Sequence, residues 1–328
     1  MRKSLKCLII AIQFLAVAPY VKVASAASNA EHYPNRPIRL MGLSVGGTTD
    51  VLSRVIGPRL TEKWGQPIVV DNRFSAGGIL PAETTARATP DGHTMIMGNA
   101  IAFVSALYLF KYLPYDPEKD FTPITMVATT TNVLVVHPSV PVGNVKELIA
   151  YAKQKGPLTY GTVGPGSLGH LTGELLKQTV DIGLTHVPYR GGGAAVTGII
   201  SGEVQVSFLS PITAHAQLKS GKVRALAVTS KSRSPAVPDI PSAVEAGVPE
   251  MEALLWFALF APAHTPRPIV TKINNAVAEI LQRDDVKRVI LQLGGEARSS
   301  TPEQLRAWLK SELAKWGPII RNAGIKAN

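Results

Sequence analysis

Three short segments of this sequence combine glycine with hydroxyl side chains and could together hold an anion. They are Ser44–Asp50 (Ser-Val-Gly-Gly-Thr-Thr-Asp), Gly161–Ser167 (Gly-Thr-Val-Gly-Pro-Gly-Ser) and Tyr189–Gly193 (Tyr-Arg-Gly-Gly-Gly). Each lies between an expected strand and an expected helix, where backbone N–H groups and a helix N-terminus can bind a carboxylate. Tight turns and ordinary helix caps explain any one of these loops equally well, but three in one chain favour an anion site. None matches G-x-x-x-x-G-K-[ST] or G-x-G-x-x-G, so a nucleotide is not indicated.

The first segment also admits a catalytic interpretation. The run Gly-Leu-Ser-Val-Gly centred on Ser44 fits G-x-S-x-G, the nucleophile elbow of α/β hydrolases. His170 or His215 would then act as the base and Asp91 or Asp181 would orient it. Ser44 lies too near the amino terminus for the upstream strands and oxyanion loop of such a fold. A secreted serine hydrolase using Ser44 is therefore the alternative rather than the main hypothesis.

The elements that must position these segments alternate along the chain. Apolar runs and helical periodicity predict a strand, a glycine-containing turn and a helix, several times in succession. The expected strands are Ile38–Met41, Ile68–Asp71, Thr94–Gly98, Thr159–Gly161, Leu184–Pro188 and Val204–Leu209, and the expected helices include Val51–Leu60, Leu168–Thr179, Ala194–Ile200 and Ile212–Leu218. Two further helices are expected after Thr265-Pro266 and after a capping box that begins at Thr301. This alternation predicts an α/β fold with largely parallel sheets covered on both faces.

Length and composition bound the class of protein. At roughly 150 residues per domain, 328 residues correspond to two domains. Hydrophobic residues make up 45% of the chain and charged residues 17%, so disorder is excluded.

The first 26 residues predict export. A basic start, an apolar run over Cys7–Ala18 and a small-residue triplet ending at Ala26 follow the plan of a secretory signal peptide, with cleavage expected after Ala26. The apolar run is short of the roughly 20 residues that span a bilayer, which argues against a membrane anchor. Cys7 is the only cysteine, so the mature chain has no disulfide, and the bacterial periplasm is the expected compartment.

Composition also bears on metals and nucleic acids. The seven histidines include no H-x-x-x-H pair, so we expect neither a metal ion nor a cofactor. Without the four basic residues of the signal, 30 basic residues face 23 acidic ones, a net charge of +7. Basic residues nowhere run longer than a pair and are not interleaved with aromatic residues, so no nucleic acid is expected as a partner.

Eight ordered blocks carry a family resemblance that covers the chain from about Tyr33 to its carboxyl end. They are Ile38-Arg39 with Gly46-Gly47-x-x-Asp50; Val70-Asp71-Asn72-Arg73 with Ala76-Gly77-Gly78; Pro90-Asp91-Gly92-His93-Thr94; Leu113-Pro114-Tyr115-Asp116-Pro117 with Asp120-Phe121-x-Pro123-Ile124; Tyr160-Gly161-Thr162-x-Gly164-x-Gly166-Ser167 with His170-Leu171; Val187-Pro188-Tyr189-Arg190-Gly191-Gly192; Gly221-Lys222-x-Arg224-Ala225-Leu226-Ala227; and Pro238-Asp239-Ile240-Pro241-Ser242 with Glu245-Ala246-Gly247. In this order the blocks resemble the Bug-type solute receptors of tripartite tricarboxylate transporters.

The resemblance implies a bilobal periplasmic-binding-protein fold of type II, with two α/β lobes, a central ligand cleft and two hinge crossings. We place the crossings near Thr131-Asn132 and near Leu255-Trp256. Lobe one would comprise residues 33–131 and 256–328, and lobe two residues 132–255. Trp256, Phe257 and Phe260 would lie near the second crossing, either lining the cleft or packing in the core.

The resemblance also implies which residues hold the ligand. In the family, backbone and hydroxyl groups of two facing loops hold one carboxylate, and the rest of the pocket selects the acid. Arg190 could pair with a second carboxylate, although a solvated loop arginine is an equally good interpretation. The candidate ligand-binding residues are Ser44, Gly46, Gly47, Thr48, Asn99, Thr162, Gly164, Gly166, Ser167, His170, Tyr189, Arg190 and Gln205.

Three departures from the family pattern bear on the ligand. Gly42–Val45 stands in place of a proline-containing aromatic stretch, Ala100–Phe103 in place of a Thr-His pair, and Gln205 in place of an acidic residue. They make the pocket less negative and favour a plain or aromatic carboxylate over an amino acid.

The implied partners are one large and one small integral membrane subunit of a secondary transporter, which the receptor would serve as a monomer. A receptor that presents its ligand to a sensor is an open alternative.

Overall fold

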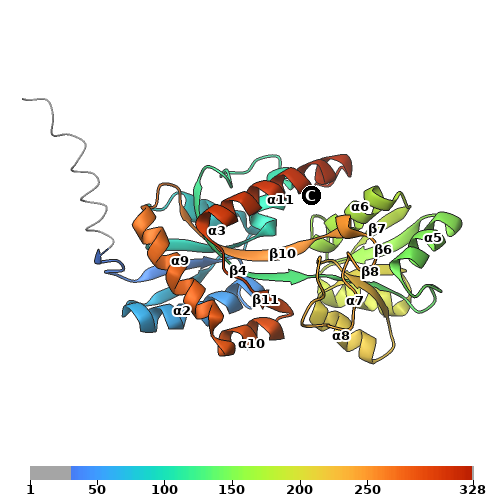
Figure 1. Cartoon of the computed structure of the whole chain (residues 1–328). Coiled ribbons are helices and arrows are strands. Elements are labelled where there is room, and N and C mark those ends of the chain that lie inside the picture. The colour runs from blue at the N-terminus through green and yellow to red at the C-terminus, as the bar shows by residue number, and fades with distance from the viewer. Residues whose placement is uncertain (1–30, 327–328) are drawn as a thin grey trace, which may run out of the picture.

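Two mixed β-sheets organise residues 31–326, the part of the chain that the computed structural model describes (Figure 1). Each sheet forms the centre of one α/β lobe, as expected for a bilobal type II fold. The expected signal peptide and its cleavage after Ala26 lie outside the described residues.

The sheet of the first lobe has six strands. In spatial order they are β11 (Gly295–Ala297), β4 (Phe121–Thr131), β10 (Leu254–Pro262), β3 (Thr94–Asn99), β1 (Ile38–Gly42) and β2 (Ile68–Asn72). Strand β1 pairs in parallel with β2 and β3, whereas β10 is antiparallel to both β3 and β4.

The sheet of the second lobe has five strands. Their order is β7 (Leu184–Pro188), β6 (Leu158–Thr162), β8 (Val206–Leu209), β5 (Val133–Val136) and β9 (Arg224–Val228). Strand β6 is parallel to β7 and β8, and β5 is antiparallel to β8 and β9. In each sheet, therefore, the strand that comes from the other lobe is inserted as an antiparallel member.

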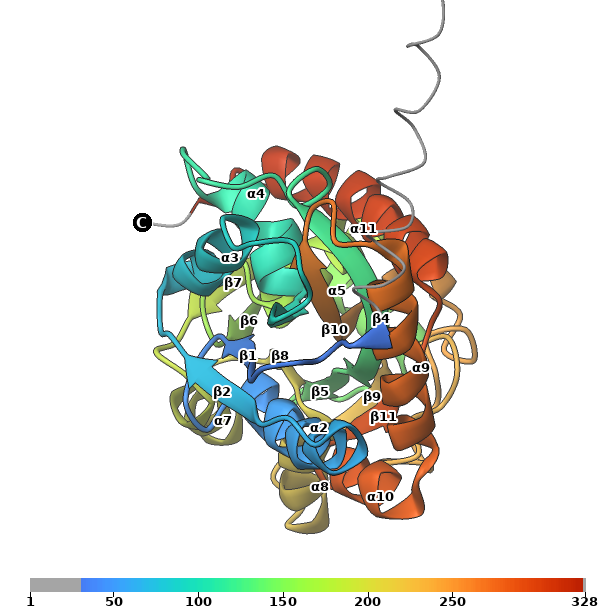
Figure 2. The same ribbon diagram turned by 90° about the vertical axis from the view of Figure 1, so that its left-hand side faces the viewer.

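Helices cover both faces of the first sheet (Figure 2). One face packs against α2 (Thr48–Trp64), α9 (Arg267–Gln282) and α10 (Asp284–Gln292). The other packs against α3 (Ile79–Ala86), α4 (Ala106–Leu109) and α11 (Pro302–Asn322), together with the short turns η1 (Ala76–Gly78) and η2 (Ile101–Ser105). Trp256 and Phe260 are fully buried on this second face, so the aromatic cluster packs in the core.

The second lobe is layered in the same way. Leu134 and Val136 of β5 point to the face covered by α5 (Val145–Lys155), α6 (Leu168–Val180) and η3 (Pro249–Met251). Val133 and Val135 point to the face covered by α7 (Gly192–Ser201) and α8 (Pro211–Lys219). This alternation follows from the two-residue period of a strand, and it explains why β5 is apolar throughout.

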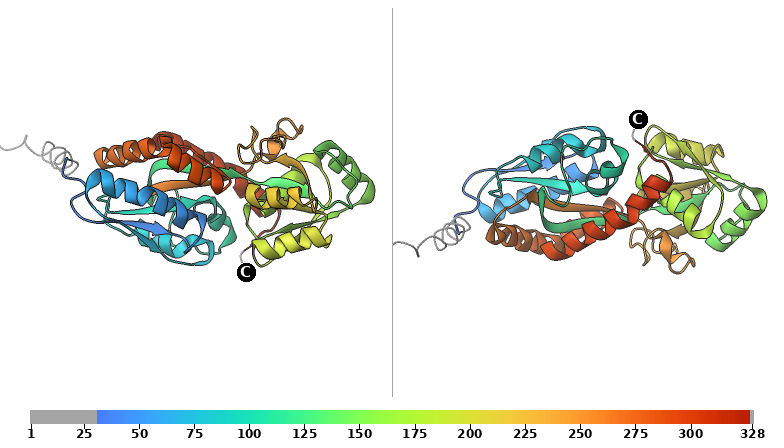
Figure 3. Two further views of the ribbon diagram at one scale, coloured as in Figure 1. Left: turned by 90° about the horizontal axis from the view of Figure 1, so that it is seen from below. Right: turned by 90° about the horizontal axis from the view of Figure 1, so that it is seen from above.

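The chain passes between the lobes near Thr229, which ties the two passages together. Strand β4 ends at Thr131 and β5 begins at Val133. The Thr229 hydroxyl accepts from the amide of Asn132 (2.9 Å) and donates to the carbonyl of Ala253 (2.7 Å), just before β10 returns to the first sheet. Figure 3 shows the two lobes end to end, with α11 reaching from the first toward the second.

Several expected elements are confirmed. The capping box of α11 is present, because Gln304 N donates to Thr301 Oγ1 (3.1 Å) and Thr301 N to Gln304 Oε1 (2.9 Å). The apolar face of α9 is buried from Ile269 to Leu281. The strand expected at Val204–Leu209 begins two residues later, since Val204 and Gln205 precede β8. Within residues 31–326, no helix combines the length and apolar character needed to cross a bilayer.

Candidate ligand-binding site

The directions of the strands bring the glycine-rich loops together between the lobes. Strand β4 runs parallel to β3, because both are antiparallel to β10, and β4 leads straight into the second lobe. The carboxyl ends of β1, β2 and β3 therefore face lobe two. In the second sheet, Val133 at the start of β5 pairs with Leu209 at the end of β8, so the carboxyl ends of β6, β7 and β8 face lobe one. Ligands of open α/β sheets bind outside such carboxyl ends.

Loop one, residues 43–47, connects β1 to α2 and is held by Asp50. Asp50 Oδ2 accepts from the Gly46 amide (2.9 Å), and Oδ1 accepts from Arg54 Nε (2.7 Å) and Asn72 Nδ2 (2.7 Å). Burial raises the pKa of Asp50, but these hydrogen bonds outweigh it and the net pKa is lowered. The carboxylate is thus ionised and fully engaged in shaping the loop.

The amino terminus of α2 is exposed beside this loop. Gly47 is its N-cap residue and no side chain caps it. A Cβ at Gly47 would lie 2.5 Å from Ser44 Oγ, so the close approach of Ser44 requires glycine there. Thr48 is exposed, and Gly46 has φ +72°, which favours glycine. This arrangement leaves the first-turn N–H groups of α2 available to an anion.

Loop two, residues 163–167, connects β6 to α6 and is closed by its own hydroxyl groups. Thr162 Oγ1 accepts from the Gly164 amide (3.2 Å), and Ser167 Oγ donates to the Gly164 carbonyl (2.7 Å). Ser167 is also the N-cap of α6, accepting from the amide of His170 (3.4 Å). Gly166 has φ +71°, and a Cβ there would lie 2.3 Å from Leu109 Cδ1 of lobe one. Loop two therefore touches the opposite lobe directly.

His170 lies behind loop two rather than on its surface. It is buried, its Nδ1 accepts from the Gly166 amide (3.2 Å), and its ring stacks on that of His186 at 3.7 Å between centroids. Burial, with smaller contributions from His186 and Lys177, lowers the pKa of His170 to about 3. His170 is thus a neutral support of the loop.

Loop three, residues 189–191, connects β7 to α7 and lies beside loop two. The Tyr189 amide donates to the Thr162 carbonyl (2.9 Å). The Tyr189 ring turns into lobe two, where a Cβ at Gly161 or Gly198 would lie within 3.0 Å of it. The ring therefore packs in the core, and the part of Tyr189 beside loop two is its backbone. Arg190 is exposed and has no ion-pair partner among the residues of the described chain.

Gln205 does not lie with these loops. Its Oε1 accepts from the backbone amide (2.9 Å) and hydroxyl (3.2 Å) of Thr159, near the start of β6. Thr162, at the end of the same strand, is about 10 Å away at 3.3 Å per residue. Gln205 therefore stabilises the end of the sheet opposite to the loops, and this contact separates it from the other candidate ligand-binding residues.

Asn99 ends β3 at the cleft-facing edge of the first sheet. Its Oδ1 accepts from the amides of Ile101 (3.1 Å) and Ala102 (3.0 Å), capping the turn that follows. This cap uses the Asn99 carbonyl oxygen and leaves the side-chain amide as a hydrogen-bond donor.

Two residues that contact loop two or its flanking Thr162 were not predicted from the sequence. They are His186, on an apolar strand, and Leu109, in a stretch without helical periodicity.

The histidines offered as catalytic partners of Ser44 are engaged elsewhere or exposed. His170 accepts from Gly166, and His215 is exposed on α8 of lobe two. Asp91 receives hydrogen bonds from Arg36 (2.6 Å) at the opposite end of β3. Across residues 31–326, no three His, Cys, Asp or Glu side chains gather where they could hold a metal ion.

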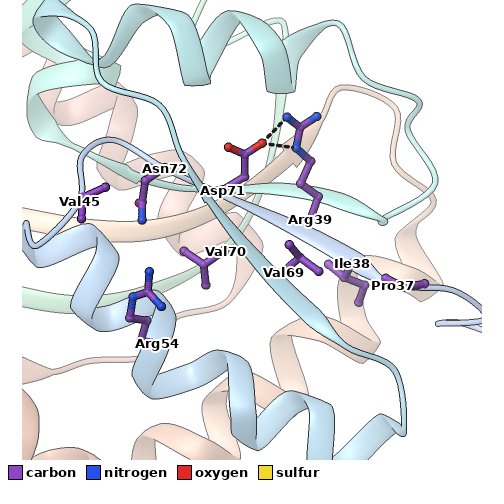
Figure 4. Close-up of a pocket in the computed structure, with 9 residues that line it drawn as sticks. All are labelled: Pro37, Ile38, Arg39, Val45, Arg54, Val69, Val70, Asp71 and Asn72. Atoms are coloured by element: carbon purple, nitrogen blue, oxygen red, sulfur yellow. Dashed lines mark hydrogen bonds and ion pairs between the residues drawn. The ribbon is translucent and has the colours of Figure 1, made fainter.

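A hollow of about 570 Å³ opens along the edge strand β2 (Figure 4). Its charged side chains neutralise one another: Arg39 Nε donates to Asp71 Oδ2 (2.7 Å), and Arg54 is bound to Asp50. In Figure 4, Arg39 and Asp71 lie on the side of the strands that faces away from α2, whereas Arg54 extends from α2 itself. This hollow is therefore lined by charges that are already paired, in contrast to the uncapped amino terminus of α2.

Two lobes joined by crossing strands, with facing glycine-rich loops at the carboxyl ends of parallel strands, define a solute-binding receptor. The family model described as "Tripartite tricarboxylate transporter family receptor" matches residues 52–325. The chain belongs to this family, whose members are periplasmic solute-binding receptors and not enzymes.

Individual relatives are similar along nearly their whole length. Protein BugT of Bordetella pertussis (strain Tohama I) is 33% identical over 305 residues, covering 92% of this chain and 94% of BugT. An R. palustris protein solved with adipate is 35% identical with a TM-score of 0.74, covering 90% of this chain and 99% of that one. MatC from Rhodopseudomonas palustris, solved with malate, is 33% identical with a TM-score of 0.70, covering 88% and 100%.

Proposed function

We propose that this protein is a periplasmic receptor that binds a small organic carboxylate between loop one and loop two. The observation that carries the proposal is the convergence of these two loops from separate lobes. The uncapped amino terminus of α2 at Gly47 and Thr48 supplies N–H donors from one side. On the other side lie Thr162, Gly164, Gly166 and Ser167, whose own hydrogen bonds shape loop two at the amino terminus of α6. Carboxylate ligands in related structures, adipate and malate, support this choice of anion.

The charges around the loops favour a plain carboxylate over an amino acid. A ligand ammonium group needs a free carboxylate, yet Asp50 is engaged by Gly46, Arg54 and Asn72, and Asp71 by Arg39. Arg190 is the exposed cation within loop three. It would pair with the second carboxylate of a dicarboxylate.

We also propose that the exported chain begins after Ala26 and that it acts as a monomer. Its partners would be one large and one small integral membrane subunit of a tripartite transporter. The hinged lobes would comprise residues 33–131 with 256–328 and residues 132–255, closing on the ligand by rotation about the crossings. The neighbouring genes distinguish delivery to a transporter from presentation to a sensor.

The test is calorimetric titration of the chain from Ala27, denatured and refolded to remove any bound ligand. The panel comprises adipate, malate, citrate, benzoate, an amino acid and a simple ester. We expect micromolar binding of one carboxylate class, roughly −8 kcal/mol, with no ester turnover. Silence toward every acid, together with ester cleavage that Ser44→Ala abolishes, would instead establish the hydrolase.

A matched pair of substitutions on β6 locates the site. Thr162→Val removes the hydroxyl that accepts from Gly164 in loop two, and we expect the affinity to fall about tenfold, the equivalent of one hydrogen bond. Thr159→Val makes the same change three residues earlier, at the far end of the strand, and should leave the affinity within about twofold. Equal effects of the two substitutions would place the ligand elsewhere.

A further inference from the structure

A stacked pair of histidines lies directly behind loop two. The imidazole rings of His170, on α6, and His186, on β7, are 3.7 Å apart between centroids and inclined by 13°. Tyr160 of β6 lies against both rings, with centroid distances of 6.3 and 5.1 Å. His170 is 7% exposed and His186 is partly buried.

Each imidazole holds one end of loop two. His186 Nε2 is 2.7 Å from Thr162 Oγ1, the hydroxyl that accepts from the Gly164 amide. His170 Nδ1 accepts from the Gly166 amide at 3.2 Å. The polar contacts of both rings therefore go to the backbone and flanking hydroxyl of loop two, the proposed ligand-binding loop of the second lobe.

The chemistry of these contacts fixes the protonation of His170. A backbone N–H can only donate, so His170 Nδ1 must be the bare acceptor nitrogen and the ring proton must lie on Nε2. An imidazolium would place an N–H at Nδ1, facing the Gly166 N–H. Two stacked imidazolium rings would also repel each other. The contact with Gly166 therefore requires a neutral His170, and the stacking disfavours a charge on both rings at once.

The surrounding groups support neutral rings. Burial is the main cause that lowers the pKa of His170, and it also lowers that of His186, where nearby Glu174 opposes it. Glu174 accepts from Tyr160 Oη (2.9 Å) and pairs with Lys177 (3.3 Å). The elements packed on α6 carry further charged groups, which are exposed or bound to other partners: Glu250 of η3, and Glu312, Lys315 and Arg321 of α11.

We propose that His170 and His186 are neutral positioning residues that hold the backbone of loop two in the shape that faces the ligand and do not themselves contact it. This inference rests on the proposed function of loop two. It assigns to His170 a role different from direct ligand binding. It also predicts how affinity depends on pH and on which ring nitrogen is replaced.

The first test needs no ligand. Long-range ¹H–¹⁵N spectra of the ligand-free chain report the tautomer and titration of each histidine. We expect His170 to be the Nε2–H tautomer and to stay neutral between pH 8 and pH 5. A protonated Nδ1 in His170, or titration near the ordinary value of about 6.5, would overturn the proposal even if the receptor function stands.

The second test uses adipate as the probe. His170→Asn places an oxygen where Nδ1 was, and His186→Gln places one where Nε2 was, so both should retain affinity within about threefold. The exchanged pair, His170→Gln and His186→Asn, puts the polar atom in the wrong place and should lose roughly 5- to 30-fold. His215→Asn and His215→Gln, on exposed α8, serve as controls and should change nothing.

The pH profile separates a positioning role from direct contact. If a protonated, cationic histidine bound the anion, adipate binding would strengthen as the pH falls from 8 to 6. If both histidines are neutral, the affinity should change by less than about twofold over this range. Strengthening that His170→Asn abolishes would overturn the proposal, as would equal losses for all four substitutions. Failure of adipate to bind the unaltered chain would count against the proposed ligand class, and the ligand-free spectra would still decide the role of the histidines.

Discussion

The contact between Gly166 of loop two and Leu109 of α4 joins the two lobes, and enlarging Gly166 should weaken ligand binding. A Cβ at position 166 would lie 2.3 Å from Leu109 Cδ1, 3.2 Å from Cδ2 and 3.3 Å from Cγ. Because the whole branched end of Leu109 is close, one rotamer change does not relieve the clash. Leu109 is itself 7% exposed within the core of lobe one, so its displacement disturbs that core.

Gly166→Ala has two energetic costs, one seen in the free energy of unfolding and the other in the ligand affinity. The φ of +71° costs an alanine about 1–2 kcal/mol in any arrangement of the lobes, and this cost lowers the free energy of unfolding. The clash costs about 1–3 kcal/mol, but only while the lobes are in contact. If ligand binding requires that contact, the affinity falls by about 5- to 150-fold.

The assay is calorimetric titration with the best carboxylate of the panel, together with urea unfolding of the ligand-free chain. Gly221→Ala is the matched control, because Gly221 has φ +67° and nothing within 4 Å of an added Cβ. It should lower stability without changing affinity. Leu109→Ala combined with Gly166→Ala should restore affinity relative to Gly166→Ala alone. Equal effects of Gly166→Ala and Gly221→Ala on affinity, or no restoration by Leu109→Ala, would refute this account of the contact.

Two further predictions concern buried carboxyl groups. The buried Glu312 accepts from two tryptophan indoles at 3.1 Å each. Glu312→Leu should therefore lower the free energy of unfolding by about 2–6 kcal/mol, because two donors lose their acceptor, whereas Glu312→Gln should cost less than about 1.5 kcal/mol. Equal losses for the two variants in urea unfolding would disprove this. Asp50→Ala should lower the free energy of unfolding by about 1–3 kcal/mol, because Gly46, Arg54 and Asn72 all lose their acceptor. Because the folded-state pKa of Asp50 is lowered, its contribution to stability is complete above its ordinary pKa of 3.8 and is lost as the pH falls through the lowered value. Asp50→Asn should remove that part of the acid dependence, and an unchanged pH profile of unfolding would contradict the assignment.

The sequence by itself determined the local elements and the places where the loops occur. Strand and helix periods are properties of neighbouring residues, so Ile38–Gly42 and the buried face of α9 follow from the order of apolar residues. The capping box at Thr301 is a contact across three residues and was predicted for the same reason. Glycines with positive φ in loops one and two, such as Gly46 and Gly166, mark turns that other residues disfavour. The ordered motif blocks then indicated the family.

Only the tertiary structure decided which side chains serve these loops. The stacking of His170 on His186 and the contact of Leu109 with Gly166 join residues far apart in the chain. The first depends on the order of the strands and the second on how the lobes meet. Gln205 lies close in sequence to β8 but at the wrong end of the sheet, which only the pairing of β6 with its neighbours shows. A strand's period tells which face a side chain takes. How far that side chain lies from a ligand depends on contacts between distant segments, which the local pattern does not encode.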